Sequence, residues 1–323
     1  MPMQKPGILL VHKPRGVRSA LCVSLLKRLG GGRFKTGHAG TLDSTAEGLL
    51  VLLTGKATRL SQYIMNFPKT YRVSVQFGIV TDTDDASGNI LEENPLPPGK
   101  KLEEMADRLL PSFLGTRMQR PPNISAVHVE GKRAHAIARS GDIPRIAEKT
   151  VSIYSFRRIS SADSQGCISF EVLCSKGTYV RSLARDMGER MGVGGHVATL
   201  TRQSLGFWDL SQALPLQALE ERNPAETAEN MTWLASVCRS PLEVARHYSV
   251  FTCPDIASAD RLRNGNAVPF RDLFRESWGV LSWKNSLVVH LSENLVFGSL
   301  KTSEETEPLF VPRGRIALEE DPS

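Results

Sequence analysis

An aspartate between two glycines is the residue of this chain whose type and setting most suggest chemistry. The run 37–50, GHAGTLDSTAEGLL, places Asp43 between Gly40 and Gly48. Glycines permit tight backbone curvature, so a bulky substrate could approach the carboxylate closely, and a carboxylate can act as nucleophile or general base. An aspartate between glycines is also a common turn residue, and both glycine-rich phosphate-binding motifs are absent. The run alone leaves a catalytic and a turn role open.

The segment around Asp43 is strongly basic. Residues 1–70 contain eleven Lys or Arg but only two acids, Asp43 and Glu47, whereas the whole chain of 323 residues carries a formal net charge of +6. Localised positive charge attracts phosphate backbones by counterion release, without reading sequence. The alternative is a solvated basic face with no partner. A polyanion drawn to this segment would meet Asp43.

Composition indicates a globular chain with a large core. It is 41% hydrophobic and 23% charged, and its length predicts one large domain with a smaller one. Five cysteines form no C-x-x-C pair and make an odd count, which favours reduced thiols and a cytosolic, hence cytoplasmic, location. There is no signal-peptide pattern and no apolar stretch near the roughly 18 residues needed to span a bilayer, so we expect a soluble protein.

The elements that must position Asp43 follow from periodicity. Residues 8–11 and 49–53 are continuous apolar runs that predict buried strands, the second covered on both faces. Ser19 is expected to cap a helix over 19–29, and a second helix is expected over 56–65. Residues 69–78 alternate with period two, which predicts a strand with Tyr71 facing inward.

The rest of the chain predicts further helices and strands, followed by a separate C-terminal module. We expect, in order, a surface connection (81–100), a helix (101–110), a basic excursion (117–145), strands (150–157, 167–174), a helix ending at 191 and a helical connection (214–246). Short strands and turns from about 248 predict a small β-rich module. The expected domains are 1–245, with the excursion as an insertion, and 246–317, followed by an acidic tail at 318–323.

Four segments in fixed order resemble the motifs of the TruB family of pseudouridine synthases. The run 37–50 resembles its aspartate motif, and Lys69-Thr70-Tyr71 resembles its Lys-x-Tyr strand. Residues 121–126 with 131–133 resemble its substrate-gripping insertion, and 174–181 resemble its arginine motif. The likeness covers roughly residues 7–205, so a turn role alone no longer explains Asp43.

The resemblance implies a fold and a reaction. The fold is α/β (α+β), a mixed and largely antiparallel sheet flanked by helices, with a small C-terminal β-rich PUA-like domain. The activity is that of an isomerase, a tRNA pseudouridine synthase acting on uridine 55 of the T-loop. The N1–C1′ glycosidic bond breaks, the base turns, and a C5–C1′ bond forms. Neither cofactor nor metal is implied, and a monomer that binds the tRNA T-arm without a protein partner or a membrane is expected.

The resemblance also implies the site residues. Asp43 would attack C1′ or remove the C2′ proton, Arg181 would keep Asp43 ionised and oriented, and Tyr71 would stack on the target base. Because a stacked uridine is inaccessible, it must leave its stack, and His38 would fill the gap. The implied substrate-binding set is His38, Gly40, Leu42, Lys69, Tyr179, Leu200, Lys132 and Arg133. The structural alternatives are a surface histidine for His38 and an ordinary core aromatic for Tyr71.

The chain departs from the family pattern near Asp43 and in the insertion. Ser44 stands where proline is usual, Glu47 replaces a small residue and is expected to point away from the pocket, and His128 and His135 replace a Lys and a Tyr. Two other functions remain open. One is a guide-RNA-dependent, dyskerin-like pseudouridylase, which the insertion argues against. The other is a tRNA-folding chaperone, with or without catalysis.

Overall fold

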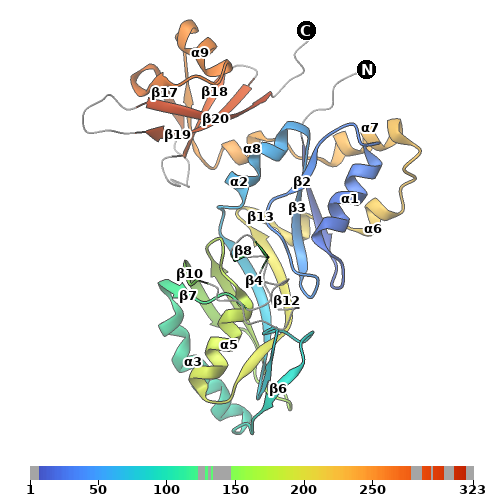
Figure 1. Cartoon of the computed structure of the whole chain (residues 1–323), viewed down its shortest axis with the longest axis vertical. Coiled ribbons are helices and arrows are strands. Elements are labelled where there is room, and N and C mark those ends of the chain that lie inside the picture. The colour runs from blue at the N-terminus through green and yellow to red at the C-terminus, as the bar shows by residue number, and fades with distance from the viewer. Residues whose placement is uncertain are drawn as a thin grey trace.

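A long sheet flanked by helices and a smaller sheet at one end make up the molecule (Figure 1). The computed structural model describes residues 7–122, 128–129, 132–133, 147–277, 286–291, 294–301 and 309–317. The long sheet runs, from one edge to the other, through β14 (Leu214–Pro215), β1 (Gly7–Lys13), β3 (Glu47–Thr54), β12 (Gly195–Leu205), β4 (Lys69–Phe77), β11 (Cys167–Cys174), β10 (Lys149–Arg158) and β7 (Gly115–Gln119). Two further short strands join it, β2 (Thr36–His38) on β3 and β13 (Trp208–Asp209) on β12.

The sheet is mixed and largely antiparallel, as predicted. Only β14 on β1 and β12 on β3 pair in parallel within this described sheet. The parallel pairing of β3 with β12 sets Arg202 opposite Gly48 and Thr201 opposite Glu47. The end of β12 therefore lies beside the chain that leaves the Asp43 loop.

The central strands β1 and β3 are buried on both faces, which confirms the interpretation of their apolar runs. Leu9 and Leu50 belong to a core beneath one layer of helices, whereas Ile8 and Leu49 belong to a second core on the opposite face. Alternate side chains of a strand point to opposite faces, so a strand covered on both sides has no polar face. The helices that contribute to the first core are α1 (Ser19–Leu29), α3 (Gly99–Phe113), α5 (Val180–Met191) and α7 (Thr227–Val237), with the short α6 (Gln217–Glu220).

Two segments differ from their predicted form. Residues 56–65 form a 3-10 turn, η1 (Gly55–Leu60), followed by the short α2 (Ser61–Ile64), in place of one helix. The Thr58 hydroxyl donates to the Gly55 carbonyl at 2.8 Å, an i to i−3 bond that favours the tighter turn. Residues 81–100 are not only a surface connection. They follow a hairpin strand β5 (Ile79–Thr81), carry its partner β6 (Ile90–Glu93), and bury two aspartates between them.

The second sheet forms the upper end of Figure 1 and packs on η1 and α2. Its order is β16 (Val268–Pro269), β20 (Leu309–Ala317), β19 (Asn294–Lys301), β18 (Ser286–Leu291), β15 (Ser249–Thr252) and β17 (Phe274–Ser277), and α9 (Ile256–Arg263) packs against it. The remaining short elements are η2 (Leu210–Gln212), α8 (Leu242–Ala245), η3 (Phe270–Asp272), β8 (His128–Val129) and β9 (Lys132–Arg133). Tyr248 donates its hydroxyl to the Tyr63 carbonyl at 2.9 Å inside the junction between the sheets. The rings of Tyr63, Tyr248 and Phe297 pack against one another there, so aromatic contacts hold the smaller sheet on the main one.

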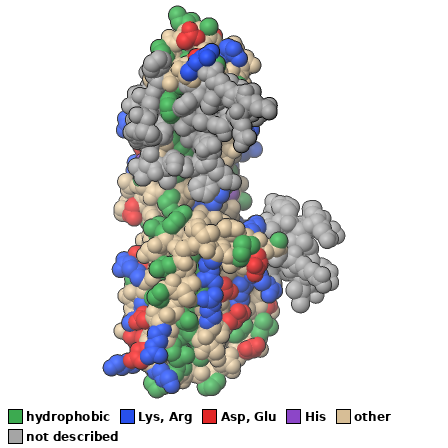
Figure 2. Space-filling view, turned by 90° about the vertical axis from the view of Figure 1, so that its left-hand side faces the viewer, with side chains coloured by type: hydrophobic (Ala, Val, Ile, Leu, Met, Phe, Trp, Pro, Cys, Tyr) green, Lys and Arg blue, Asp and Glu red, His purple; other side chains and the backbone are tan. Residues whose placement is uncertain are grey.

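The surface carries both signs of charge. On the face shown in Figure 2, Lys and Arg side chains alternate with Asp and Glu over the lower half of the molecule. Among the described helices, none is long and apolar enough to cross a membrane.

Candidate active site

The Asp43 loop connects β2 to β3 and is held from below by two buried side chains. Ser19 is the first residue of α1, not its cap, and its hydroxyl binds the backbone of Leu42. The Lys13 ammonium is fully buried and donates to the Ala46 carbonyl at 2.6 Å. Gly40 has a φ of +99°, a left-handed conformation that favours glycine. The loop therefore presents Asp43 from a fixed base, with 48% of its side chain exposed.

Arg181 reaches Asp43 from the first turn of α5. Its Nη2 lies 2.9 Å from Asp43 Oδ2, and its side chain is only 8% exposed. Its Nη1 donates to the Thr83 carbonyl at 2.9 Å. A buried guanidinium bound to a carboxylate orients that carboxylate more firmly than an exposed pair would. The two groups that the sequence predicted to meet are therefore in contact.

Asp85 completes this group and was not predicted. Its Oδ2 lies 3.6 Å from Arg181 Nη1 and accepts a hydrogen bond from the Thr45 hydroxyl at 3.1 Å. Burial acts to raise the pKa of Asp85, but hydrogen bonds from Ser87 and Thr83 and the charge of Arg181 outweigh burial and lower the pKa overall. Asp85 is thus a buried anion that fixes the other side of the Arg181 guanidinium. Its setting, TDTDDASG, has only the composition of a turn.

A cleft of about 920 Å³ opens over Asp43 and Arg181. It brings together five of the predicted substrate-binding residues, Gly40, Leu42, Lys69, Tyr179 and Leu200, with Tyr71, which was predicted to be catalytic. Tyr71 is 8% exposed and belongs to the same core as Val73, Val75 and Phe77, which confirms its inward direction. Its pKa is raised by burial. At neutral pH it therefore offers a neutral aromatic face to the cleft.

Arg202 forms the floor of the cleft and was also missed. It is 1% exposed, and its guanidinium donates to the carbonyl oxygens of Leu49 at 2.7 Å and Gly40 at 3.1 Å. In the pairing of β12 with β4, Arg202 lies opposite Tyr71. One side chain thus joins the Asp43 loop to β3, next to the cleft tyrosine. Nothing in the pattern LTRQSL distinguishes this arginine from one that faces solvent.

Lys69 lies in the wall of the cleft with little contact to water. Its ammonium nitrogen donates to the carbonyl oxygens of Phe67 at 2.6 Å and Met65 at 2.8 Å. Burial, followed by the charge of Arg202, lowers the pKa of Lys69 to about 7. The Lys69 side chain therefore stabilises the cleft wall by hydrogen bonds, and its own charge changes near neutral pH.

His38 does not line this cleft. It lies at the end of β2, its Nδ1 is buried without a hydrogen-bond partner, and burial lowers its pKa, so the ring is neutral at pH 7. That it fills a gap left by everted bases stays a prediction. The side chains of Lys132 and Arg133 lie outside the described residues, and their contacts with RNA also stay predictions. In the described part of the chain, no three His, Cys, Asp or Glu side chains cluster as metal ligands do.

The chain is similar to pseudouridine synthases in sequence. The model of the TruB family pseudouridylate synthase (N terminal domain) matches residues 27–180. A tRNA pseudouridine synthase B of Synechococcus sp. (strain WH7803) is 44% identical over 223 residues, which cover 69% of this chain and 72% of the relative. The chain belongs to the TruB family. Another tRNA pseudouridine synthase B, from Ehrlichia ruminantium (strain Gardel), is 34% identical over 269 residues, or 83% of this chain and 88% of the relative.

A solved structure shows the same fold over nearly the whole chain. A chain from the crystal structure of a Cbf5-Nop10-Gar1 complex superposes with a TM-score of 0.66 at 20% identity, covering 95% of this chain and 83% of that one. The expected α/β fold with a separate C-terminal sheet is therefore confirmed.

Two departures from the TruB pattern have definite places in the loop. Glu47 is not among the residues that line the cleft, and its carboxylate accepts a hydrogen bond from the Thr201 hydroxyl at 3.1 Å, in agreement with the expectation that it points away. The Ser44 carbonyl accepts from the Gly16 amide at 2.7 Å, so the backbone here is tied without proline.

The start of the TruB insertion belongs to the sheet. Arg117 lies in β7, places its guanidinium 4.6 Å from the centre of the Phe113 ring, and lies 4.0 Å from Asp186. Assigning Arg117 to a basic excursion was therefore wrong: residues 115–119 pair with β10, and a side chain that packs on an aromatic ring is held there. Most of residues 123–146 lie outside the described residues.

Proposed function

We propose that this protein isomerises uridine 55 in the T-loop of tRNA to pseudouridine. The observation that carries the proposal is the 2.9 Å ion pair between Asp43 and Arg181 in a cleft that Tyr71 also lines. Membership of the TruB family supports the same reaction, because relatives with 34% and 44% identity are named tRNA pseudouridine synthase B.

The chemistry conserves every atom of the nucleotide except one exchanged proton. Asp43 acts on the ribose, either by attack on C1′ or by removal of the C2′ proton, and the N1–C1′ bond breaks. The freed base turns and joins C1′ through C5; this breaks the Asp43–C1′ bond if Asp43 attacked C1′, whereas a proton taken from C2′ is returned to C2′. The C5 proton is lost to solvent, and N1 gains a proton. No group is transferred to or from another molecule, so no cofactor is needed.

The cleft suits a nucleotide that has left its stack. Its volume of about 920 Å³ is open above Asp43, whose carboxylate is half-exposed and so can be reached. Tyr71 stacks on the everted base, and Tyr179 and Leu200 line the pocket for it. Lys132 and Arg133 of the insertion hold the RNA backbone, because positive side chains position the phosphates without reading the base sequence.

The C-terminal sheet contributes to the same surface. Arg313 of β20 and Gly298 of β19 line the cleft together with residues of the main sheet. We assign residues 1–245 to the catalytic domain and 246–317 to a PUA-like RNA-binding domain that extends the cleft. The protein works as a monomer on the T-arm of tRNA in the cytoplasm. Five unpaired cysteines support that compartment.

The decisive experiment replaces Asp43 by Asn and measures tritium release from C5-labelled uridine in unmodified tRNA. The amide retains the shape of the carboxylate but is neither nucleophile nor base, so turnover should fall by at least about four orders of magnitude. Glu47→Gln is the matched control, since it removes the other carboxylate of the loop without altering the cleft. Turnover by Asp43→Asn at the wild-type rate would remove Asp43 from the mechanism.

A second experiment separates the stand-alone enzyme from the alternatives. Purified protein should convert uridine in a bare T-arm stem-loop with no added RNA or protein. Conversion only after a guide RNA and partner proteins are added would favour the dyskerin-like reading. Restoration of tRNA folding by Asp43→Asn would reveal a chaperone role alongside catalysis.

A further inference from the structure

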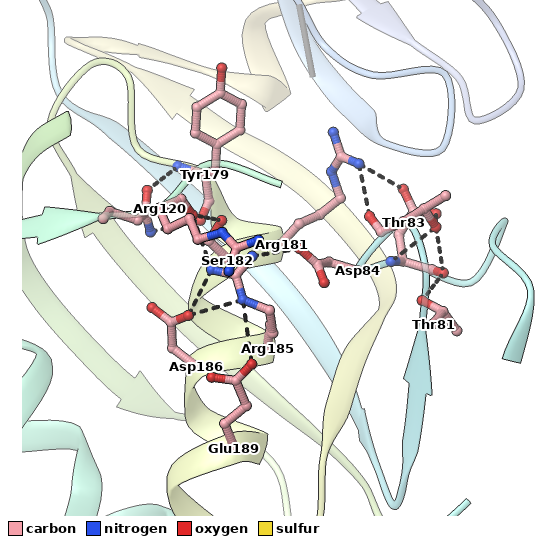
Figure 3. A network of polar contacts seen from close by, with 12 residues as sticks. Thr81, Thr83, Asp84, Arg120, Tyr179, Arg181, Ser182, Arg185, Asp186 and Glu189 are labelled. Carbon is pink, nitrogen blue, oxygen red and sulfur yellow. Dashed lines mark hydrogen bonds and ion pairs between the residues drawn. The ribbon is translucent and has the colours of Figure 1, made fainter. Parts of the chain in front are cut away.

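Two arginines of α5 bind one short segment of the chain. Arg181 and Arg185 are four residues apart, so they lie on the same face of the helix, one turn from each other. Arg181 contacts the carbonyl of Thr83 and the carboxylate of Asp85. Arg185 Nη1 lies 2.9 Å from Asp84 Oδ2 (Figure 3). The contacts to 83–85 thus alternate between the two arginines.

Asp84 has the backbone conformation that makes this alternation possible. Its φ is +58°, and it is the sole non-glycine residue with positive φ in the described ranges. Aspartate tolerates this conformation better than most residues, but it is still less stable than an ordinary turn. Asp84 is 8% exposed, and its carbonyl accepts from the Val197 amide at 3.0 Å. The conformation is therefore held by contacts on both its side chain and its backbone.

Arg185 is the side-chain contact that offsets the burial of Asp84. Burial raises the pKa of Asp84, and the charges of Arg185 and Arg181 oppose this. Without Arg185, a buried carboxylate would lose its nearest positive charge, and the segment would gain by moving Asp84 toward water. Such a movement would displace Thr83 and Asp85, which hold Arg181.

The far side of Arg185 is fixed as well. Its Nη2 donates to the Arg120 carbonyl at 3.0 Å, and the Ser182 hydroxyl donates to the same oxygen at 2.8 Å. One residue earlier, the Gln119 side-chain amide exchanges two hydrogen bonds with the backbone of Tyr179. Figure 3 shows Arg185 with Arg120 on one side and Asp84 on the other. The first turn of α5 is therefore clamped on one side by 119–120 and on the other by 83–85.

We propose that Arg185 and Asp84 act as a positioning pair, which sets the guanidinium of Arg181 against Asp43 and so determines the rate of the chemical step. The inference rests on the proposed function of Asp43. Neither residue lines the cleft over Asp43, so both act through the 83–85 segment and not by contact with the reacting nucleotide. A displacement of about 1 Å at a reacting group can lower a rate on the order of 100-fold, which makes such a pair consequential.

The test measures single-turnover tritium release and tRNA affinity separately in Asp84→Asn, Arg185→Met and the double variant. Asn keeps the left-handed conformation and the shape of Asp84 but loses the charge. We expect each single variant to lower the rate roughly 10- to 100-fold with tRNA affinity within about twofold of wild type. Because the residues act as a unit, the double variant should be no slower than the slower single variant.

Controls distinguish the possible failures. Arg190→Met removes another arginine of α5, one that contacts Ser112 and Phe113 away from the segment, and it should leave the rate unchanged. Arg185→Lys retains the charge and should recover part of the rate. Weakened tRNA binding at an unchanged rate, or additive losses in the double variant, would overturn the pairing. If Arg185→Met does not fold, Asp84→Asn alone decides, since a wild-type rate in it also overturns the proposal. An inactive wild-type enzyme would contradict the proposed function instead.

Discussion

The hydroxyl of Ser19 holds the backbone of Leu42 by two hydrogen bonds. It donates to the Leu42 carbonyl oxygen at 2.8 Å and accepts from the Leu42 amide nitrogen at 3.0 Å. The residue next to Asp43 is thus anchored to the first turn of α1, 23 positions earlier in the chain. One buried hydroxyl satisfies both backbone polar groups of Leu42.

Ser19→Ala should loosen the loop and slow the reaction. Both backbone groups of Leu42 would be left buried without a partner, at a cost of about 1–3 kcal/mol in the free energy of unfolding. We expect a lower kcat with little change in tRNA affinity. Urea unfolding and steady-state tritium release measure the two effects. Ser24→Ala is the control, because Ser24 is on the same helix but bonds only its own turn at the surface. Equal effects of the two substitutions would contradict a special role for Ser19.

Arg202→Lys should damage stability and rate together, although the charge is kept. A single ammonium cannot replace the two separate nitrogens that donate to the carbonyls of Leu49 and Gly40, so at least one buried acceptor is abandoned. The expected loss in the free energy of unfolding is about 1–3 kcal/mol. The expected fall in kcat is roughly tenfold or more, because the loop that carries Asp43 shifts. Arg157→Lys on the exposed side of β10 serves as the comparison, and a neutral effect of Arg202→Lys would show that the contacts are dispensable.

Gly48→Ala should prevent the native pairing of β3 with β12. A Cβ there would lie 2.4 Å from the carbonyl oxygen and 2.6 Å from the amide nitrogen of Arg202, and φ is +113°. Backbone atoms within a sheet cannot move aside as a flexible side chain can. Gly115 also has positive φ, but a Cβ there would have no atom within 4 Å. Gly115→Ala therefore measures backbone strain alone, which should lower the free energy of unfolding by about 1–2 kcal/mol. Thermal unfolding should show a much larger fall in melting temperature for Gly48→Ala than for Gly115→Ala, and similar falls for both variants would contradict the steric argument.

Lys69 should make stability rise with pH above neutrality. Burial, aided by Arg202, lowers its pKa from 10.5 to about 7. Between these values the unfolded chain binds a proton that the folded chain releases, so the free energy of unfolding increases with pH by at most about 1.4 kcal/mol per unit. This stabilisation is lost progressively as the pH falls from 10.5, and it is almost completely lost once the pH reaches about 7. Denaturation curves from pH 6 to 10 should show a flatter dependence in Lys69→Met than in wild type, whereas exposed Lys56→Met should match wild type. Parallel pH curves for Lys69→Met and wild type would refute the assignment.

Periodicity predicted the elements that depend on local pattern. Alternating apolar residues predicted the strand that contains Tyr71, because a strand points every second side chain to one face. A continuous apolar run predicted that β3 is buried on both faces. The prediction of a single helix over 56–65 was wrong: Gly55–Leu60 form a 3-10 turn, within which the Thr58 hydroxyl bonds to the Gly55 carbonyl, and only Ser61–Ile64 are α-helical. Asp84 and Asp85 escaped prediction because an aspartate- and threonine-rich stretch has the same composition whether it lies in water or over a buried arginine.

The amino-acid sequence alone determined the family, the expectation that Asp43, Tyr71 and Arg181 share a site, and the mixed sheet that carries them, because these reside in local motifs and their order. Only the tertiary structure decided which distant polar groups meet. The bonds of Ser19 to Leu42, of Arg202 to Gly40 and of Arg185 to Asp84 join positions remote in the chain. Burial gives these contacts their strength, and burial is a property of the packed fold that no short stretch of residues contains.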